Sequence, residues 1–366
     1  MQISKLLLSD FRNHKNLNLS FSPGATTIIG PNGRGKTNIV EAVHYLATLG
    51  SHRVSQDGPL IRSGLTTAHV GATVIKHDRH AQVELTINYP GVNKVILNGA
   101  ALPKTKNLLG LVSTVIFSPE DLDLIKGEPG SRRRFIDDFS TLLIPKFINT
   151  RSEYERTLKQ RNALLKSLGR RTPTESAKAT LAAWDEQLVT HGSELIATRL
   201  QNLTKLQPHI STFGNTISGD SEPLIVNYSC TWLAKETVSV TEIEKEFRTQ
   251  LEKRFKEEVE RGVTLVGPHR DDLEILLSDM PAKGYSSHGQ SWSIAIALRL
   301  ATFTVLRDHD DDPILILDDV FAELDEKRRT RLINAITGVE QTLITAAVLE
   351  DVPKDLLSNQ LLLNDN

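Results

Sequence analysis

The chain has 366 residues, of which 39% are hydrophobic and 24% charged; it is longer than one hydrophobic core usually serves, so about two domains are expected. Its formal net charge of −2 carries no global sign of nucleic-acid binding, and a single cysteine, Cys230, excludes an internal disulfide framework. No apolar run approaches the roughly 18 residues that cross a bilayer, so we expect a cytoplasmic protein with no membrane partner.

The first part of the chain, to about residue 141, alternates short strand patterns with turns. Leu17, Leu19 and Phe21 alternate with polar residues, as a half-buried antiparallel strand requires. Asn98-Gly99 is a turn signal between two such segments. The expected strands are 3–8, 17–21, 70–75, 83–89, 94–97 and 112–117.

A phosphate-binding loop of the pattern G-x-x-x-x-G-K-T stands near the start of the chain. Its residues are Gly30, Pro31, Asn32, Gly33, Arg34, Gly35, Lys36 and Thr37. The glycines allow backbone N–H groups to surround a polyphosphate, Lys36 can reach its terminal phosphates, and the Thr37 hydroxyl can ligate Mg²⁺. A buried-strand pattern at 25–29 precedes the loop, and apolar residues at helical spacing follow it through 38–49. Strand, loop and helix in this order predict nucleotide binding.

The middle of the chain is helical from about 131 to 206, with another helix expected at 242–260 before Gly262. Heptads long enough for an extended coiled coil are absent, which predicts a compact helical lobe. From Arg151 to Lys178 there are eight basic and three acidic residues, including Arg170 and Arg171. Two interpretations stay open, a solvated helix face and a surface that contacts DNA phosphates. The candidate DNA-binding residues are Arg132, Arg133, Arg134 and Arg161.

The α/β pattern returns after Gly262. We expect strands at 273–277, 314–317 and 342–344 and helices at 292–306 and 326–336. The simplest architecture is one α/β ATPase domain built from both chain ends, with the helical lobe inserted between them. The predicted parts are 1–130, 131–261 and 262–366.

The apolar strand expected at 314–317 ends in two adjacent carboxylates, Asp318 and Asp319. Sites of parallel sheets lie at such carboxyl ends. Asp318 is placed to hold Mg²⁺, and Asp319 is the candidate general base for water. An aspartate that caps a helix would explain one carboxylate but not two.

A third element, residues 286–290, opens the helix expected at 292–306. Small hydroxyl residues, a glycine and a helix N-terminus together form an anion-binding surface. Because the phosphate loop lies elsewhere in the chain, this surface suggests the γ-phosphate of a nucleotide held by a partner subunit. A capped helix after a flexible turn would have the same sequence. Asp325 is a suitable N-cap for the next helix.

These elements in this order resemble the ABC-type ATPases, in particular their SMC-like branch. Further segments look like the RecF family of bacterial recombinational-repair proteins, and the resemblance covers nearly the whole chain. The segments are LLLSDFRN, GPNGRGKTNIVEAV, SPEDLDLIKGEPGSRRRFID, LKQRNALLK, VGPHRDD, SSHGQSW and ILDDVFAELD. LKQRNALLK and GPHRDD are more specific to that family than the phosphate loop is.

The resemblance implies a weak, DNA-stimulated ATPase that dimerises head to head with ATP. Residues 30–37 would bind ATP in cis, and Ser287 and Gly289 would contact the γ-phosphate held by the partner. Asp318 and Asp319 would act as the Mg²⁺-binding and water-activating acids. The implied partners are single-stranded and gapped double-stranded DNA and mediators of the RecR and RecO type. The implied roles are recombinase loading and support of the SOS response, and the implied location is the nucleoid.

Several positions depart from the transporter ATPases. Asp319 stands where they carry Glu, and the signature lacks their Ser-Gly-Gly core. No clear Gln follows the strand expected at 112–117 to ligate Mg²⁺, and Glu120 is a candidate substitute; Thr345 stands where they carry their γ-phosphate-sensing His. These departures argue against a transporter subunit, and the absence of N-K-x-D argues against a GTPase. A non-hydrolysing scaffold that binds ATP stays open.

Overall fold

The computed structural model describes residues 1–169, 172–219, 222–234, 239–309 and 312–363. The chain forms two compact units. Unit 1 consists of Met1–Lys126, His209–Leu224 and Ala282–Asn366, and unit 2 of Gly127–Pro208 and Ile225–Pro281. Unit 1 thus combines both chain ends, whereas the boundaries expected at 130 and 261 differ from the limits of these units.

Unit 1 contains an antiparallel six-stranded sheet of order β2-β1-β4-β5-β6-β7. Leu6 and Leu8 of β1 are buried while Lys5 and Leu7 are exposed, because alternate side chains of a strand point to opposite faces; a register shift between Ile3 and Lys5 allows Ile3 to be buried as well. Asn98 and Gly99 both have positive φ, as the predicted tight turn requires. The strands are β1 Gln2–Phe11, β2 His14–Ser20, β4 Thr67–Lys76, β5 Arg79–Asn88, β6 Lys94–Leu97 and β7 Ala100–Ala101.

The second sheet of unit 1 is parallel, with order β14-β3-β13-β12-β8. Its strands come from both ends of the chain: β3 Gly24–Ile29, β8 Thr114–Phe117, β12 Ile314–Asp318, β13 Gln341–Ala346 and β14 Asn359–Leu362. The expected α/β class, with a head assembled from both chain ends, is confirmed. The sequence did not predict β14, a short edge strand whose residues are only half-buried or exposed.

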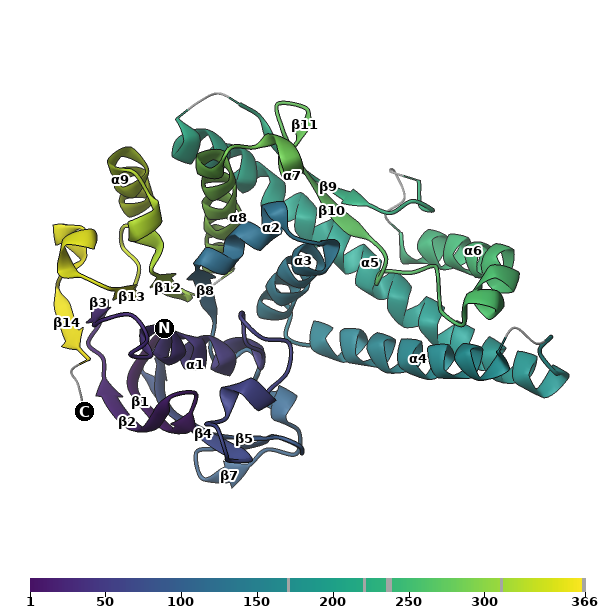
Figure 1. Ribbon diagram of the computed structural model, residues 1–366, viewed down its shortest axis with the longest axis horizontal. Coiled ribbons are helices and arrows are strands. Elements are labelled where there is room, and N and C mark those ends of the chain that lie inside the picture. Colours follow the sequence, from purple (N-terminus) through teal and green to yellow (C-terminus); the bar gives the residue numbers. More distant parts are fainter. Residues whose placement is uncertain (170–171, 220–221, 235–238, 310–311, 364–366) are drawn as a thin grey trace. The chain divides into compact units, whose positions relative to one another are not determined.

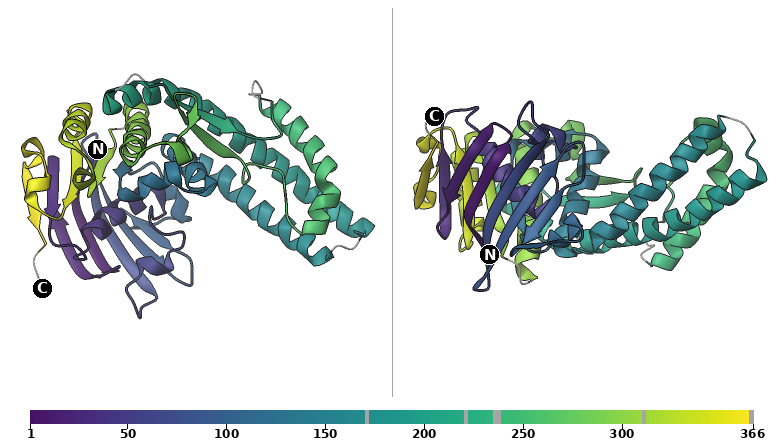
Figure 2. Two further views of the ribbon diagram at one scale, coloured as in Figure 1. Left: turned by 45° about the horizontal axis from the view of Figure 1, so that its top comes forward. Right: turned by 90° about the horizontal axis from the view of Figure 1, so that it is seen from below.

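The view from below shows the six-stranded sheet of unit 1 with no helix over its near face, and helices lie behind it (Figures 1 and 2). Helix α1, Lys36–Thr48, contacts strands of both sheets and has ten buried residues. Helix α8, His288–Asp308, is buried over most of its circumference, so it is a core helix and not merely apolar on one face. The other helical segments of unit 1 are η1 Gly58–Leu60, η2 Thr105–Leu108, η3 Pro119–Asp121, α2 Leu122–Lys126, α7 Ala282–Tyr285, η4 Val320–Glu323, α9 Glu326–Ala335, η5 Leu349–Asp351 and η6 Lys354–Leu356.

Unit 2 is the expected helical lobe, and it also contains a small sheet that the sequence predicted only in part. Its helices are α3 Pro129–Leu143, α4 Phe147–Leu168, α5 Glu175–Ser218, which continues into unit 1, and α6 Val240–Arg261. The three-stranded sheet has the order β11-β10-β9, with β9 Leu224–Ser229, β10 Asp272–Leu277 and β11 Met280–Pro281. Tyr154 of α4, Leu188 of α5 and Phe247 of α6 pack in one core cluster.

Helix α5 extends through Pro208, beyond the limit of 206 expected from the sequence. A proline inside a helix costs about 3 kcal/mol. Leu206, Ile210 and Ile217 on either side of it are fully buried. Their burial, worth about 1.5–3 kcal/mol each, offsets that cost. Within the part of the chain that the structure describes, no helix has the length and apolar character of a membrane span.

Candidate nucleotide-binding site

The phosphate loop lies between the end of β3 and the first turn of α1, as predicted. Gly33 and Gly35 have φ of 83° and 91°, a backbone conformation that side chains other than glycine rarely adopt. Pro31, Asn32 and Arg34 are exposed. The loop backbone is therefore accessible to a ligand at the N-terminus of a helix, where N–H groups favour an anion.

Lys36 folds back over this loop. Its ammonium group donates to the carbonyl oxygens of Gly30 at 2.8 Å and Pro31 at 3.3 Å, and to Asn32 Oδ1 at 3.3 Å. Only 4% of the residue is exposed. Among the described residues, this buried cation is held by neutral carbonyl groups and not by a carboxylate, so the loop fits a polyphosphate.

The acidic strand meets the phosphate loop through one hydrogen bond. The Thr37 hydroxyl donates to Asp318 Oδ1 at 3.0 Å. Thr345, at the end of β13, donates to the same oxygen at 2.6 Å and accepts the backbone N–H of Asp319 at 3.0 Å. Parallel pairing of β12 with β13 places Asp318 opposite Thr345. The structure thus brings together Thr37, Asp318, Asp319 and Thr345 from three segments.

Burial raises the pKa of Asp318 to about 6, and the neighbouring Asp319 carboxylate adds to this effect. A bound cation would favour the ionised form. Glu120, in η3, contributes to the same negative potential, and its Oε2 is buried without a hydrogen-bond partner among the described residues. Mg²⁺ prefers oxygen ligands, so Thr37 and Asp318 fit a hard divalent cation, and the Glu120 carboxylate adds negative charge nearby.

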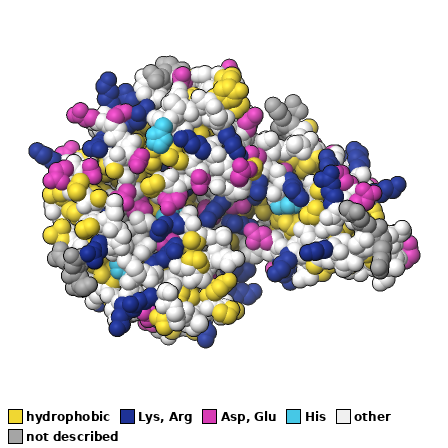
Figure 3. Space-filling view, in the orientation of Figure 1, with side chains coloured by type: hydrophobic (Ala, Val, Ile, Leu, Met, Phe, Trp, Pro, Cys, Tyr) yellow, Lys and Arg dark blue, Asp and Glu magenta, His cyan; other side chains and the backbone are white. Residues whose placement is uncertain are grey.

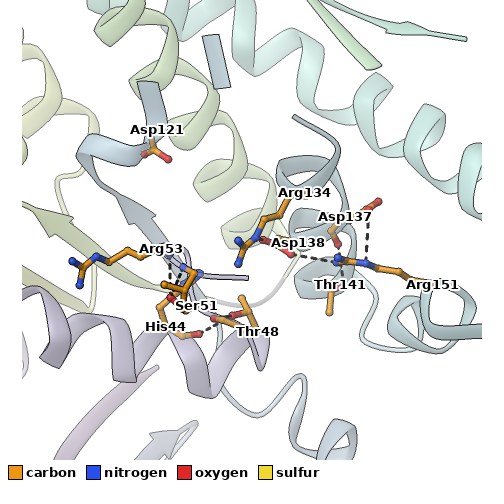
Figure 4. Close-up of polar contacts among 12 residues, drawn as sticks. His44, Thr48, Ser51, Arg53, Asp121, Arg134, Asp137, Asp138, Thr141 and Arg151 are labelled. Atoms are coloured by element: carbon orange, nitrogen blue, oxygen red, sulfur yellow. Dashed lines mark hydrogen bonds and ion pairs between the residues drawn. The ribbon is translucent and has the colours of Figure 1, made fainter. Parts of the chain in front are cut away.

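Arg53 is a residue of this site that sequence reasoning missed. It donates to Asn38 Oδ1 at 3.0 Å and lies 3.4 Å from Glu120 Oε1 and 3.6 Å from the buried Glu41. Figure 4 shows it beside Ser51, whose Oγ accepts the Arg53 backbone N–H at 3.0 Å. An isolated arginine in an irregular segment carries no recognisable pattern. Only its contacts identify it.

A cavity of about 830 Å³ lies on this side of the loop. Its lining includes Arg12, Asn13, Asn38, Arg53 and Tyr89. Asn38 donates to Asn13 Oδ1 at 2.7 Å, and the Asn13 amide reaches the carbonyl of Gly33 at 3.5 Å. The cavity therefore adjoins Asn13, which reaches the phosphate loop, and it offers polar and cationic groups together with an aromatic ring.

The signature residues open helix α8, as predicted. The Ser287 hydroxyl accepts the backbone N–H of Gln290 at 3.2 Å, and Gln290 Oε1 accepts the backbone N–H of Ser287 at 2.9 Å. This capping box satisfies two N–H groups of the helix end. Ser287 is exposed and Gly289 half-exposed. The hydroxyl is thus occupied as a cap, while the N-terminus of α8 stays accessible.

Two of the four arginines expected to contact DNA are structural, and that expectation was wrong for both. Arg161 is fully buried, and its guanidinium lies 2.5 Å from Asp185, 2.7 Å from Glu258 and 2.8 Å from Thr264. Arg132 is 6% exposed and donates two hydrogen bonds of 2.8 Å to the Asp272 carboxylate. Guanidinium groups that are buried in such pairs cannot reach a phosphate.

The other basic residues differ in exposure. Arg133 is half-buried and donates to the Asp271 carbonyl at 2.8 Å. Arg134 lies 3.4 Å from Asp138, beside Arg151, which also approaches Asp138 (Figure 4). Figure 3 shows both basic and acidic side chains over helices α4 and α6. Lys159 and Lys166 of α4 are exposed, whereas Arg170 and Arg171 lie outside the described residues.

Comparison with known proteins gives a consistent result. The family described as "RecF/RecN/SMC N terminal domain" matches residues 2–353. The DNA replication and repair protein RecF of Streptomyces avermitilis is 46% identical over 356 residues, covering 96% of this chain and 95% of that protein. RecF of Rhodococcus erythropolis is 41% identical over 375 residues, with 97% and 92% covered.

Solved structures agree in fold. The recombination mediator protein RecF with ATP, of the RecFOR pathway, is similar with a TM-score of 0.88 at 31% identity, covering 96% of this chain and 93% of that chain. An Smc head bound to the C-winged helix domain of ScpA has a TM-score of 0.52 at 18% identity, covering 95% and 90%. The second likeness concerns the fold alone.

Proposed function

The chain belongs to the RecF family of DNA replication and repair proteins, and on this premise we propose that it is an ATP-controlled DNA-binding protein of recombinational repair. The hydrogen bond between Thr37 and Asp318 carries the proposal, because it joins the phosphate loop to the acidic strand in one site. A solved relative of the same fold is described with ATP. A site of this composition is suited to a nucleoside triphosphate with Mg²⁺.

We assign the roles of the residues that contact ATP bound to the same chain from the hydrogen bonds that they make. Residues 30–37 hold the phosphates, with Lys36 exchanging loop carbonyls for phosphate oxygens. Thr37 and Asp318 would hold Mg²⁺, which would neutralise phosphate charge when bound. Asp319 orients or activates the attacking water from the end of β12. The cavity beside Asn13 and Asn38 is large enough for the remainder of the nucleotide.

The site needs a second copy of the chain. Ser287 and Gly289 lie at an accessible helix end, which in a head-to-head dimer contacts the γ-phosphate held by the partner. ATP shifts the population toward the dimer only if the dimer binds it better than the monomer does. The closed dimer would hold DNA, and hydrolysis would release it.

The proposed DNA substrates are single-stranded and gapped double-stranded DNA, bound through exposed cations and not through Arg132 or Arg161. A relative is described as a recombination mediator of the RecFOR pathway. We therefore propose RecO- and RecR-type partners, a role in recombinase loading and the SOS response, and a cytoplasmic, nucleoid-associated location.

Sedimentation with ATP, ADP and gapped DNA tests these couplings together. The parent should dimerise and retain DNA with ATP but not with ADP. Lys36→Ala should lose ATP binding, dimerisation and stable DNA binding. Lys5→Ala, at an exposed position of β1, is the matched control and should behave as the parent. If Lys36→Ala dimerised and bound DNA normally, the clamp mechanism would be wrong.

A further inference from the structure

Helix α9 begins with a side-chain network that reaches the signature helix α8. Asp325 caps α9, with its Oδ1 accepting the backbone N–H of Arg328 at 2.8 Å. Its other oxygen accepts Nη1 of Arg328 at 2.5 Å. One carboxylate therefore fixes both the backbone and the guanidinium of Arg328, and these contacts hold the pKa of Asp325 below its usual range.

The opposite edge of the guanidinium meets α8. Arg328 Nε donates to Ser293 Oγ at 2.9 Å, and Ser293 Oγ donates to the carbonyl of Gly289 at 3.1 Å. A Cβ at Gly289 would lie 3.1 Å from Arg328 Nη2 and 3.2 Å from Nη1. The guanidinium therefore lies directly against the signature glycine, and a side chain at Gly289 would require it to move by a few tenths of an ångström.

A cap alone does not explain this arrangement. Asp325 would cap α9 through the backbone N–H without any guanidinium. Arginine adds a planar group whose donors point in fixed directions, so it holds two helix ends at a defined spacing. A second contact joins the same segments, because His288 Nε2 lies 3.7 Å from Glu323 Oε2.

We propose that Arg328 is a positioning residue that sets the signature end of α8 against the Asp325 segment, so that both meet the partner's ATP as one preformed surface. This inference rests on the proposed function, because it concerns the composite site between two copies. Groups that are ordered before association lose less entropy when they bind. Arg328 therefore contributes to dimerisation and not to the binding of ATP by one chain.

Two variants test the link from its two sides. Arg328→Met removes the guanidinium, and Ser293→Ala removes its acceptor on α8. Each should weaken ATP-dependent dimerisation about tenfold, as expected for the loss of a hydrogen bond to a charged group. Fluorescent-ATP titration of the monomer should give a Kd within about twofold of the parent value, because neither residue belongs to the phosphate loop. Lys327→Met, exposed on the same helix, is the control and should dimerise normally.

The double variant should dimerise no worse than Arg328→Met, because residues of one network act non-additively. Normal dimerisation by Arg328→Met or Ser293→Ala would overturn the proposal, as would additive effects in the double variant. A fall in melting temperature with dimerisation unchanged would assign Arg328 to local packing alone, which also overturns it. Should Arg328→Met fail to fold, Ser293→Ala decides the question. Dimerisation by Lys36→Ala would instead refute the proposed function, so the two failures are distinguishable.

Discussion

The Thr345 hydroxyl lies 2.6 Å from Asp318 Oδ1, and it accepts the backbone N–H of Asp319 at 3.0 Å. A hydroxyl has one proton, so that proton points to Asp318 and a lone pair faces Asp319. One side chain therefore orients both members of the acidic pair. The sequence indicated only that Thr345 stands where a transporter ATPase carries a histidine.

Thr345→Val should test this relationship, because it keeps the shape of the side chain and removes both hydrogen bonds. Hydrogen bonding to Thr345 lowers the pKa of Asp318, so its loss should raise that pKa further above about 6. We expect Mg²⁺-dependent ATP affinity to fall about tenfold. Titration with Mg²⁺ and with EDTA measures this, and Thr345→Ser should retain the parent affinity. Equal affinities for the Val and Ser variants would contradict the role.

Asp319→Asn should separate binding from hydrolysis. Asp319 has a φ of 51°, a conformation that asparagine tolerates, so the backbone should be unchanged. Loss of a general base lowers turnover by about 10²–10⁴-fold. ATP binding and dimerisation should persist while DNA is released more slowly, as followed by phosphate release and DNA dissociation. Unchanged hydrolysis would remove Asp319 from this role.

Arg161→Met should destabilise unit 2. The substitution leaves the carboxylates of Asp185 and Glu258 without their buried cation. Removal of one partner from a buried pair costs about 3–5 kcal/mol. Urea unfolding measures the loss, and Arg156→Met, in an exposed pair with Glu153, should cost less than about 1 kcal/mol. Similar losses in the two variants would show that Arg161 is not a structural anchor.

Charge reversal on α4 should test the remaining basic surface. Lys159→Glu with Lys166→Glu changes two exposed cations, so DNA binding should weaken. If both contact phosphates, the slope of log affinity against log salt should flatten by about 2. Fluorescence anisotropy over a salt series measures it, with Lys5→Glu as the control. An unchanged slope would make this surface a solvated helix face.

Stability should depend on pH through Asp271. Burial raises its pKa to about 6, against about 3.9 in an unfolded chain. Because the folded pKa is raised, its contribution to the free energy of unfolding is complete below about pH 4 and is lost as the pH rises through about 6. Asp271→Asn keeps an acceptor for the Tyr228 hydroxyl, 2.6 Å away, but cannot ionise.

The free energy of unfolding of Asp271→Asn should therefore rise relative to the parent between pH 4 and 7, by up to about 3 kcal/mol. Urea unfolding at both pH values gives the difference. Asp123→Asn, at an exposed position of α2, should show no such trend. A difference that does not vary with pH would mean that Asp271 ionises normally.

The fold class and the core of the site were predictable because their signals are local. The loop from Gly30 to Thr37 contains glycines that adopt the positive φ angles that a phosphate loop needs. An apolar strand that ends in Asp318 and Asp319 is typical of a parallel sheet with a site at its carboxyl edge. Local patterns failed where burial overrides propensity. The helical pattern was expected only to about residue 206, but α5 continues through Pro208 to Ser218, and the edge strand β14 was not predicted.

The sequence by itself determined which chemical groups occur and which local structures carry them. Only the tertiary structure decided which of the arginines are available. Arg161 and Lys159 both belong to the basic run, but the partners of Arg161 come from α5 and α6, and such distant pairing leaves no local pattern. For the same reason, the contacts of Arg53 with Glu120 and of Thr345 with Asp318 could be identified only in the folded chain, where separate segments lie together. A charged side chain that is buried in an ion pair stabilises the fold, whereas an exposed one is accessible to a ligand such as DNA.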